Sequence, residues 1–386
     1  MTPPDTRTAV PVVAPEAVLE APDAVAIDLR SPKEFAEDHV PGAVNVPLFN
    51  DVERAVIGAL YHRSSPERAF EEARAITRAK IGALVRDLAA AAGWELPLAD
   101  LEERVERITS GGLACMEEEL APMALAEPPE RPVLLYCWRG GLRSRSVTAL
   151  VRELGLERAV ALEGGYKGWR RHVMESLAAF EPPPVFVLRG LTGVGKTLVL
   201  RELERIRPGW TVDLEALAGH RGSILGMVGL EPCSQKAFET RLCARLAAGF
   251  PGPCVLEGES RKIGDAVLPA RVWEALDGGV NVLLETPLEG RVDVLIADYL
   301  ACQENRAMLR EQLPFIEERL GRSKWSGELV RLLDGGRERE LVRVLLERYY
   351  DPLYRHSETG RTYATKADAS DPARAARAVA AWIERS

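Results

Sequence analysis

Short runs of apolar residues alternate with helix-like segments in the first half of the chain. The runs AVAIDLR (24–30), PVLLYC (132–137) and AVALEGG (159–165) have the length and composition of buried strands. The segments SPKEFAEDH (31–39) and SRSVTALVREL (144–154) have helical spacing, and the first opens with serine and proline, as many helices do. Because strands that alternate with helices form parallel sheets, this pattern predicts an α/β domain.

A long stretch between two of these strands has a different pattern. After the turn and short strand VPGAVNVPL (40–48), over eighty residues precede PVLLYC without strand-like alternation. Within them, SPERAFEEARAITRAKIGALVRDLAAAAGW (65–94) is rich in alanine and places apolar residues at helical spacing. We therefore predict a helical insertion at about residues 50–128.

A run of three prolines, Pro182 to Pro184, separates the first half of the chain from the second. Prolines favour an extended connection and cannot continue a helix. We therefore predict two domains, residues 1–178 and residues 179–386.

The second domain begins with PVFVLRGLTGVGKTLVLREL (184–203), which predicts a strand, a glycine-rich loop and a helix. The apolar runs at 253–260 and 280–288 predict further buried parallel strands, and the pattern is mainly helical from about residue 289. The fold class is thus α/β in both domains, with a helical region near the C-terminus.

The composition is that of a globular protein, with 46% hydrophobic and 28% charged residues. No apolar run has the roughly 18 residues that a membrane span needs, and the N-terminal residues lack the apolar core of a signal peptide. We therefore expect a cytoplasmic protein without a membrane partner. The six cysteines form no CxxC pair or other metal-type spacing, which predicts free thiols and no zinc site.

The net charge of −8 argues against a chain that is coated by nucleic acid, but the charge is uneven. Residues 131–172 carry nine Lys and Arg residues against three Asp and Glu residues, a local net charge of +6. This basic stretch is a candidate contact for a nucleic-acid backbone.

Residues 190–197, GLTGVGKT, match the phosphate-loop pattern GxxxxGK[ST] at the junction of strand and helix. Glycines let consecutive backbone N–H groups turn toward phosphate oxygens, and the following helix adds its positive N-terminal end. Lys196 can reach the terminal phosphates, and the Thr197 hydroxyl is a candidate ligand for Mg²⁺. The motif predicts a site for a diphosphate or larger, formed by Gly190, Thr192, Gly193, Val194, Gly195, Lys196 and Thr197.

The strands that follow leave the nature of the phosphate compound open. A nucleotide hydrolase usually has a strand that ends in an aspartate, which orders Mg²⁺. The candidate strands here end at Glu257 and Glu285. ATP chemistry therefore does not follow from the motif, and no metal ligand is assigned beyond the candidate Thr197.

The stretch LLYCWRGGLRSRSV (134–147) sets Cys137 between a strand and a loop that contains glycines and arginines. Backbone N–H groups, the N-terminus of the next helix, Arg139 and Arg143 would all favour the thiolate. A thiolate among cations can transfer a chalcogen atom and hold an oxyanion beside it. The alternative is a buried structural cysteine, which we favour for the other five, Cys115, Cys233, Cys243, Cys254 and Cys302.

Three stretches, IDLRSPKEFAEDHVPGAVNVP (27–47), LLYCWRGGLRS (134–144) and LEGGYKGW (162–169), together resemble a rhodanese domain. The long helical insertion departs from an ordinary rhodanese. A rhodanese domain joined to a phosphate loop is narrower still, and resembles the tRNA 2-selenouridine synthase family over nearly the whole chain. Supporting stretches are FNDVERAVIGALYH, DLEALAGHRGSILG, SQKAFETRL, LEGESRKIG and YYDPLY.

This resemblance implies an enzyme that acts on 2-thiouridine at the wobble position of tRNA. The family moves a geranyl group from geranyl diphosphate to the sulfur, and then replaces the geranylthio group with selenium from selenophosphate. No tightly bound cofactor is expected, and Mg²⁺ is a candidate ion. The resemblance assigns catalysis to Cys137, and binding of selenophosphate and tRNA to Trp138, Arg139, Gly140, Gly141 and Arg143.

The resemblance also implies substrate-pocket segments in the second domain, at 213–223 and 256–264. Arg221 and Arg261 are candidate phosphate or tRNA contacts, and Glu257 is a candidate Mg²⁺ ligand or base. For each of these residues the alternative is a structural salt bridge or a helix cap. The candidate residues are Asp213, Arg221, Ser223, Glu257, Ser260 and Arg261.

Two other functions compete with this one. The chain could be a P-loop kinase or ATPase that drives sulfur transfer from a rhodanese carrier, or a tRNA or nucleotide sensor without turnover. Cys137 argues against the sensor, since a sensor needs no reactive thiol. Trp138 likewise has two interpretations, a stacking platform for a base or a side chain packed on its own domain.

Overall fold

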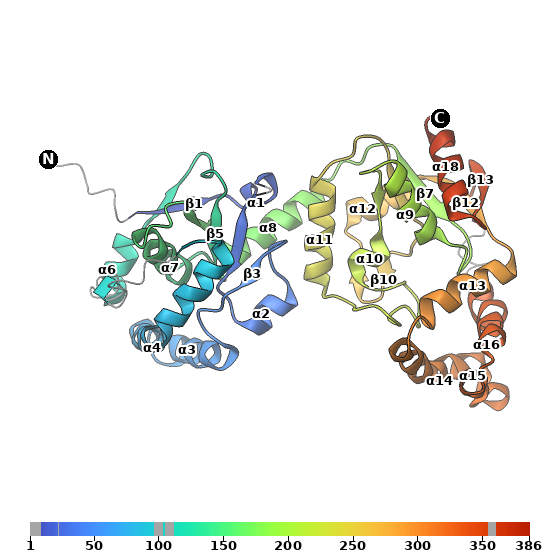
Figure 1. Ribbon diagram of the computed structural model, residues 1–386, viewed down its shortest axis with the longest axis horizontal. Helices are drawn as coiled ribbons and strands as arrows, with labels where there is room; N and C mark the ends of the chain where they lie inside the picture. The colour runs from blue at the N-terminus through green and yellow to red at the C-terminus, as the bar shows by residue number, and fades with distance from the viewer. Residues whose placement is uncertain (1–8, 22, 96–102, 105–111, 354–359) are drawn as a thin grey trace. The chain divides into compact units, whose positions relative to one another are not determined.

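The computed structural model describes residues 9–21, 23–95, 103–104, 112–353 and 360–386. The chain divides into two compact units, Met1–Ser176 and Leu177–Ser386 (Figure 1). Each unit contains its own parallel sheet with helices on it, and each is described by itself below.

The first unit is built on six strands that run parallel, in the order β3-β2-β5-β6-β1-β4. The central strands β5 and β6 are VLLY and AVAL, and all their residues are buried. Helices on both faces of a parallel sheet explain why these strands are continuous apolar runs. The strands are β1 (Val10–Val13), β2 (Val25–Asp28), β3 (Val44–Asn45), β4 (Pro122–Ala124), β5 (Val133–Tyr136) and β6 (Ala159–Leu162).

The helices of the first unit bury apolar faces against this sheet. The long helix α4 buries Ile81, Leu84, Val85 and Leu88 in a core shared with α7 and strands β2 and β5. Its N-cap Ser65 accepts a hydrogen bond from the N–H of Arg68, and it ends at Gly93 in the left-handed conformation. The helices are α1 (Ala17–Glu20), α2 (Pro32–Glu37), α3 (Asp51–Arg63), α4 (Pro66–Ala92), α6 (Gly112–Glu119), α7 (Leu142–Glu153) and α8 (Gly165–Ala178).

Two strands of this sheet were not expected from the sequence. Strand β1 lies between β6 and β4, and β4 forms the edge within the segment predicted as a helical insertion. The described part of the insertion contains α3, α4 and α6 but is not wholly helical, while residues 96–102 and 105–111 lie outside the described residues. Strand β4 has three exposed residues, so it carries no alternating pattern that would reveal it.

The second unit is built on five parallel strands in the order β13-β12-β7-β9-β8. Strand β7 precedes the phosphate loop, as predicted, and lies at the centre of the sheet. Strand β9 pairs with it in a register that puts Glu257 opposite Leu188. The strands are β7 (Val185–Arg189), β8 (Thr211–Val212), β9 (Cys254–Glu257), β12 (Val280–Glu285) and β13 (Thr365–Asp368), beside an antiparallel pair, β10 (Lys262–Ile263) and β11 (Ala266–Val267).

The C-terminal part of the second unit is mainly helical, as predicted, and it has its own apolar core. Strand β13 interrupts this region, because its exposed and half-buried residues alternate as an edge strand rather than as a helix. The helices of this unit are α9 (Lys196–Ile206), α10 (Leu214–Ala218), α11 (Gln235–Ala247), α12 (Ala270–Gly278), α13 (Leu288–Tyr299), α14 (Gln303–Trp325), α15 (Glu328–Asp334), α16 (Glu338–Val344), the π-helix η1 (Leu345–Tyr350) and α18 (Pro372–Ile383). Among the described residues, none of the helices has the length and apolar character required to cross a membrane.

Candidate active site: a cysteine loop and a phosphate loop

Cys137 is the first residue after the buried strand β5, and the loop that it begins leads directly into α7. The backbone of this loop packs against the first turn of α8. The N–H of Tyr166 donates to the carbonyl of Cys137 at 2.8 Å, and the N–H of Lys167 donates to the carbonyl of Trp138 at 3.0 Å. The loop is therefore fixed by hydrogen bonds between two segments that the sequence separates.

Two glycines allow this close approach. Gly140 and Gly165 both have positive φ angles, +64° and +56°. A Cβ atom on Gly165 would lie 2.3 Å from the nitrogen of Gly140 and 2.4 Å from the carbonyl oxygen of Cys137. Both atoms belong to the backbone, so the loop has this shape only with glycine at position 165.

The surroundings of the Cys137 thiol favour its charged form. The side chain is buried, and its Sγ lies 3.3 Å from the Ser144 hydroxyl. Burial raises the pKa of the Cys137 thiol, but the Arg143 charge, the Ser144 hydroxyl and backbone N–H groups outweigh burial and lower the pKa below its ordinary value. At a given pH, a larger fraction of Cys137 is therefore thiolate than in an ordinary buried cysteine.

A network of buried charged residues contacts Tyr166, whose backbone binds the cysteine loop. Arg30 is 1% exposed and makes a bidentate pair with Asp28, with Nη2 2.6 Å from Oδ2. The Arg30 guanidinium also lies 3.7 Å from the centre of the Tyr166 ring, and the Tyr166 hydroxyl donates to Asp38 at 2.8 Å. Because every charge in this network is partnered, it holds the Tyr166 backbone that binds the cysteine loop.

The remaining predicted residues of the loop differ in exposure. Arg139 is exposed, Arg143 is half-buried, and Gly141 precedes the first residue of α7. The half-buried Trp138 ring lies 5.4 Å from the Tyr166 ring, so it packs at least partly on its own domain. The loop thus brings one thiol and two arginines together on one short segment.

In the second unit, the phosphate loop connects the end of β7 to α9, which begins at Lys196. The positive φ angles of Gly190, Gly193 and Gly195 let the loop curl. Helix α13 fixes its backbone, because the Arg291 Nε donates to the carbonyl of Thr192 at 2.9 Å while Arg291 is paired with Asp351.

A cavity of about 270 Å³ lies over this loop. It is lined by loop residues from Thr192 to Thr197 and by Asp213, Arg221 and Ser223 of the predicted substrate pocket. Apolar side chains form another part of its wall, among them Leu230, Val294, Leu295 and Tyr299. The cavity thus combines phosphate-binding groups with an apolar surface.

The structure does not bring every predicted residue of the second unit into this cavity. Ser260 and Arg261 are exposed and do not line it. Gly190 directly follows β7, where a Cβ atom would be 2.6 Å from the carbonyl oxygen of Leu284, so the start of the loop has no room for a side chain. Glu257 is fully buried beside the cavity, below Thr197.

Sequence reasoning missed two further carboxylates, Glu215 and Glu259, which line the cavity with Asp213. We call Asp213, Glu215, Glu257 and Glu259 the acidic cluster. Its members follow the ends of the neighbouring strands β8 and β9, and in each segment two carboxylates are spaced by two residues. At the end of β9 this spacing places Glu257 and Glu259 on one face of extended chain, whereas Asp213 is the N-cap of α10 and Glu215 lies in its first turn. Acidic residues directly after an apolar strand are the signal that could have found them.

The pKa values of Glu215, Glu257 and Glu259 in the acidic cluster are raised above their ordinary value. The Thr197 hydroxyl lies 3.0 Å from Glu257 Oε2 and 3.2 Å from Glu215 Oε2. Burial and the Glu259 charge raise the pKa of Glu215 to about 8, and burial raises the pKa of Glu257 well above its ordinary value. The Thr197 hydroxyl can donate its one proton to only one of these two carboxyl groups. The other carboxyl group can donate to the hydroxyl oxygen if it is protonated.

The cluster also contacts the phosphate-loop lysine through Glu259. Lys196 Nζ lies 3.8 Å from Glu259 Oε1, and both side chains are nearly buried. Burial raises the pKa of Glu259, and the Lys196 charge offsets only part of this effect. A diphosphate that enters the cavity therefore competes with Glu259 for Lys196.

The same oxygens match the chemistry of Mg²⁺, which prefers hard oxygen ligands and keeps several waters. In the part of the chain that the structure describes, no group of three or more His, Cys, Asp or Glu side chains is arranged to hold a metal ion alone. Thr197, Glu215 and Glu257 would hold the ion together with phosphate oxygens and water, and bound Mg²⁺ would neutralise phosphate charge.

A rhodanese fold with a cysteine loop, followed by a phosphate-loop domain, defines the class of this protein. Residues 183–385 match the family model described as "tRNA 2-selenouridine synthase AAA domain", and residues 16–79 and 97–172 match the "Rhodanese-like domain". The chain belongs to the tRNA 2-selenouridine synthase family of enzymes.

Curated relatives named tRNA 2-selenouridine synthase match over most of their length. That of Chromohalobacter salexigens is 32% identical over 373 residues, which cover 90% of this chain and 91% of the relative. Those of Marinobacter nauticus and Hydrogenovibrio crunogenus are 31% and 30% identical, and the matches cover 87% and 85% of this chain and 89% and 87% of the relatives.

Replacing Gly165 with alanine should disturb the cysteine loop, because the added Cβ would collide with its backbone. We expect Gly165→Ala to raise the pH midpoint of the reaction of Cys137 with iodoacetamide. Mass spectrometry of the Cys137 peptide measures the alkylated fraction at each pH. The matched control is Gly155→Ala, where φ is +105° but no atom lies within 4 Å of the added Cβ. Equal midpoints in the two variants would contradict the steric argument.

The raised pKa of Glu215 predicts how stability depends on pH. The folded state keeps the Glu215 proton up to about pH 8, whereas the ordinary pKa is 4.5, so the folded state binds more protons between these values. The free energy of unfolding of the second unit should therefore fall as pH rises from about 5 to about 8. Thermal unfolding measured across this interval should show a smaller decline for Glu215→Gln than for wild type. The exposed Glu231→Gln is the control, and an unchanged slope in Glu215→Gln would contradict the prediction.

Proposed function

We propose that the protein converts wobble 2-thiouridine in tRNA to 2-selenouridine through an S-geranyl intermediate, with geranyl diphosphate and selenophosphate as co-substrates. The observation that carries the proposal is the presence in one chain of two different sites. One is a cysteine loop whose thiol pKa is lowered, and the other is a phosphate loop with an apolar wall. The names of the relatives support a tRNA substrate.

In the first step, the sulfur of 2-thiouridine attacks C1 of geranyl diphosphate. The C1–O bond breaks, diphosphate leaves with the electron pair, and the base loses its N3 proton, so that S-geranyl-2-thiouridine forms. Charge develops on the leaving diphosphate, which Lys196 and the N-terminus of α9 are placed to stabilise. The Leu230, Val294 and Leu295 side chains suit the hydrocarbon chain of this substrate better than a nucleoside.

In the second step, selenium replaces the geranylthio group at C2. Alkylation makes the sulfur a better leaving group, so that the Cys137 thiolate adds at C2 and geranylthiol leaves with one proton. Selenium of selenophosphate then adds at C2, and the Cys137 thiolate leaves. Water then cleaves the Se–P bond, phosphate is released, and the C2 selenium remains on the base. Cys137 supplies the soft nucleophile of this site, and Arg139 and Arg143 attract the selenophosphate anion.

The tRNA would contact exposed cations of the basic stretch. Several arginines of this stretch are used internally, since Arg145 donates to the carbonyl of Leu120 and Arg152 to that of Ala159. Exposed members remain for phosphate contacts, namely Arg131, Arg139, Lys167 and Arg171. A tRNA substrate also agrees with the expected cytoplasmic location.

One observation favours the second candidate function, a P-loop ATPase or kinase coupled to sulfur transfer. Glu257 ends β9, the strand beside β7, and its carboxyl group contacts the Thr197 hydroxyl. This is the arrangement in which nucleotide hydrolases bind Mg²⁺, although they usually use aspartate.

Mass spectrometry of tRNA nucleosides tests both functions. The protein is incubated with 2-thiouridine tRNA, selenophosphate and either geranyl diphosphate or ATP. Geranylated and then selenated uridine should form only with geranyl diphosphate. Neither product with geranyl diphosphate would refute the proposal, and ATP-dependent turnover would favour the alternative.

The Lys196→Ala variant should lose geranylation by about 10²–10³-fold in rate, because one preorganised charge on the leaving group is removed. The rate of geranylthiouridine formation measures this loss. The control is Lys262→Ala, which removes an exposed lysine of the same unit. A wild-type rate in Lys196→Ala would show that the diphosphate binds elsewhere.

The Cys137→Ser variant should form geranylated thiouridine and accumulate it. Serine keeps the size and the arginines of the loop but removes the soft nucleophile, which geranyl transfer does not need. A time course of thiouridine, geranylthiouridine and selenouridine compares this variant with wild type and with Cys302→Ser, which replaces an exposed cysteine. Normal selenouridine formation would show that Cys137 is only a structural thiol. Loss of geranylation would contradict the assignment of the two steps to two different sites.

A further inference from the structure

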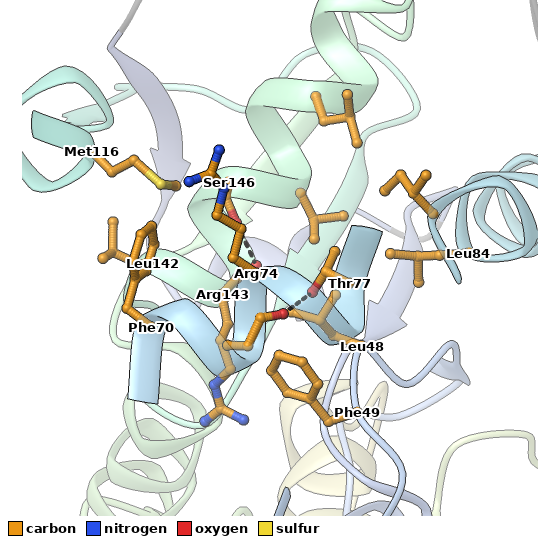
Figure 2. Close-up of a pocket in the computed structure, with 14 residues that line it drawn as sticks. Leu48, Phe49, Phe70, Arg74, Thr77, Leu84, Met116, Leu142, Arg143 and Ser146 are labelled. Atoms are coloured by element: carbon orange, nitrogen blue, oxygen red, sulfur yellow. Dashed lines mark hydrogen bonds between the residues drawn. The ribbon is translucent and has the colours of Figure 1, made fainter. Parts of the chain in front are cut away.

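The helical insertion of the first unit encloses an apolar cavity of about 110 Å³. Helix α4 provides one wall with Phe70, Ala73 and Ile81, and helix α7 provides another with Leu142 and Val147. Figure 2 shows Phe70, Leu142, Met116, Phe49 and Leu48 around this space. An ordinary rhodanese domain has no such insertion, and the proposed second step has so far assigned this cavity no role.

The polar residues of the lining do not call for a polar ligand in the middle of the cavity. The Thr77 hydroxyl donates to the carbonyl of Ala73 at 2.8 Å, and the Ser146 hydroxyl donates to that of Arg143 at 3.4 Å. The guanidinium groups of Arg74 and Arg143 lie apart in Figure 2, one toward the upper and one toward the lower end of the drawn lining, and most of the other lining residues are apolar. The space between these ends therefore suits hydrocarbon.

The cavity and the cysteine share the first turns of α7. Ser144 on this helix contacts the Cys137 thiol at 3.3 Å, while its neighbours Leu142, Arg143 and Ser146 line the cavity. Arg143 belongs to both places, because its charge also favours the Cys137 thiolate. The cavity and the Cys137 thiol are thus contacted by neighbouring residues of one helix, with Arg143 common to both.

The volume limits what this group can be. A dry protein cavity of about 150 Å³ takes benzene, which has six carbons. By the same measure, a cavity of 110 Å³ takes a group of about four carbons, most of one five-carbon isoprene unit. A geranyl chain has two such units, so the end of the chain fits inside and the unit next to sulfur lies toward the thiol.

We propose that this cavity is the subsite for the distal isoprene unit of the S-geranyl group while the modified base is at the cysteine loop. The inference rests on the proposed function and deepens it. The geranyl chain is bound at the apolar wall of the second unit during transfer, and at the insertion of the first unit during selenation. Binding of the hydrocarbon favours the alkylated base over unmodified 2-thiouridine in the second step.

The test uses chains of different length on the same tRNA. Full-length protein and selenophosphate are supplied with tRNA that already carries S-methyl-, S-geranyl- or S-farnesyl-2-thiouridine, and kcat/KM for selenouridine formation is measured. One buried methylene group is worth roughly a fourfold change in binding. Wild type should therefore prefer geranyl to methyl by at least about tenfold.

Two variants should change the chain-length preference in different ways, one by filling the cavity and one by enlarging it. Ala73→Leu fills the cavity from α4 and should lower the geranyl-to-methyl ratio at least tenfold, whereas the matched control Ala75→Leu, on an exposed position of the same helix, should keep the wild-type ratio. Phe70→Leu enlarges the cavity and should raise the farnesyl-to-geranyl ratio. Misfolding cannot produce both shifts, since it lowers all rates together.

The outcomes separate this inference from the proposed function. Selenation with the same chain-length ratios in wild type, Ala73→Leu and Phe70→Leu would overturn the inference and leave the proposed function intact. Equal rates with methyl and geranyl in wild type would do the same. Selenation of none of the substrates by wild type would overturn the proposed function and this inference with it.

Discussion

Both candidate sites depend on contacts of backbone with backbone at the ends of parallel strands. Because neighbouring parallel strands end at one edge of a sheet, the loops that follow them can meet there. In the first unit, the loop after β5 lies against the turn after β6, and the contact between Gly140 and Gly165 leaves no room for a side chain. In the second unit, Gly193 lies equally close to α13, where a Cβ atom would be 2.9 Å from the Arg291 carbonyl oxygen. These contacts fix the loops before any substrate arrives.

The electrostatics of the two sites are opposite in sign, and each suits a different reactant. Around Cys137, arginines and backbone N–H groups overcome the effect of burial and favour an anion. Around Thr197, buried carboxylates favour protonation and pair with the lysine that a diphosphate requires. The first arrangement activates a nucleophile and attracts small anions. The second pairs Lys196 with Glu259, with which an entering diphosphate competes.

The helical insertion changes what a rhodanese fold can bind. Helix α4 contributes to the core of the first unit through Leu84, Val85 and Leu88, yet its N-terminal half leaves a cavity against α7. Protein interiors are ordinarily packed without such gaps. The insertion thus adds an apolar surface beside a loop whose own chemistry is polar.

The sequence alone determined the elements and residues that local patterns specify. The central strands β5, β6, β7 and β9 were predictable because buried parallel strands are continuous apolar runs, and the two loops because glycine, lysine, cysteine and arginine stand at fixed spacing. Tertiary structure decided the edge strands β4 and β13, which have no buried residues to show a pattern, and it placed the short buried strand β1 between β6 and β4. It also decided that Glu215 and Glu259 meet at Lys196 and that Ser260 and Arg261 stay outside. Such choices depend on burial and on charges brought together from distant segments, and neither is written in local sequence.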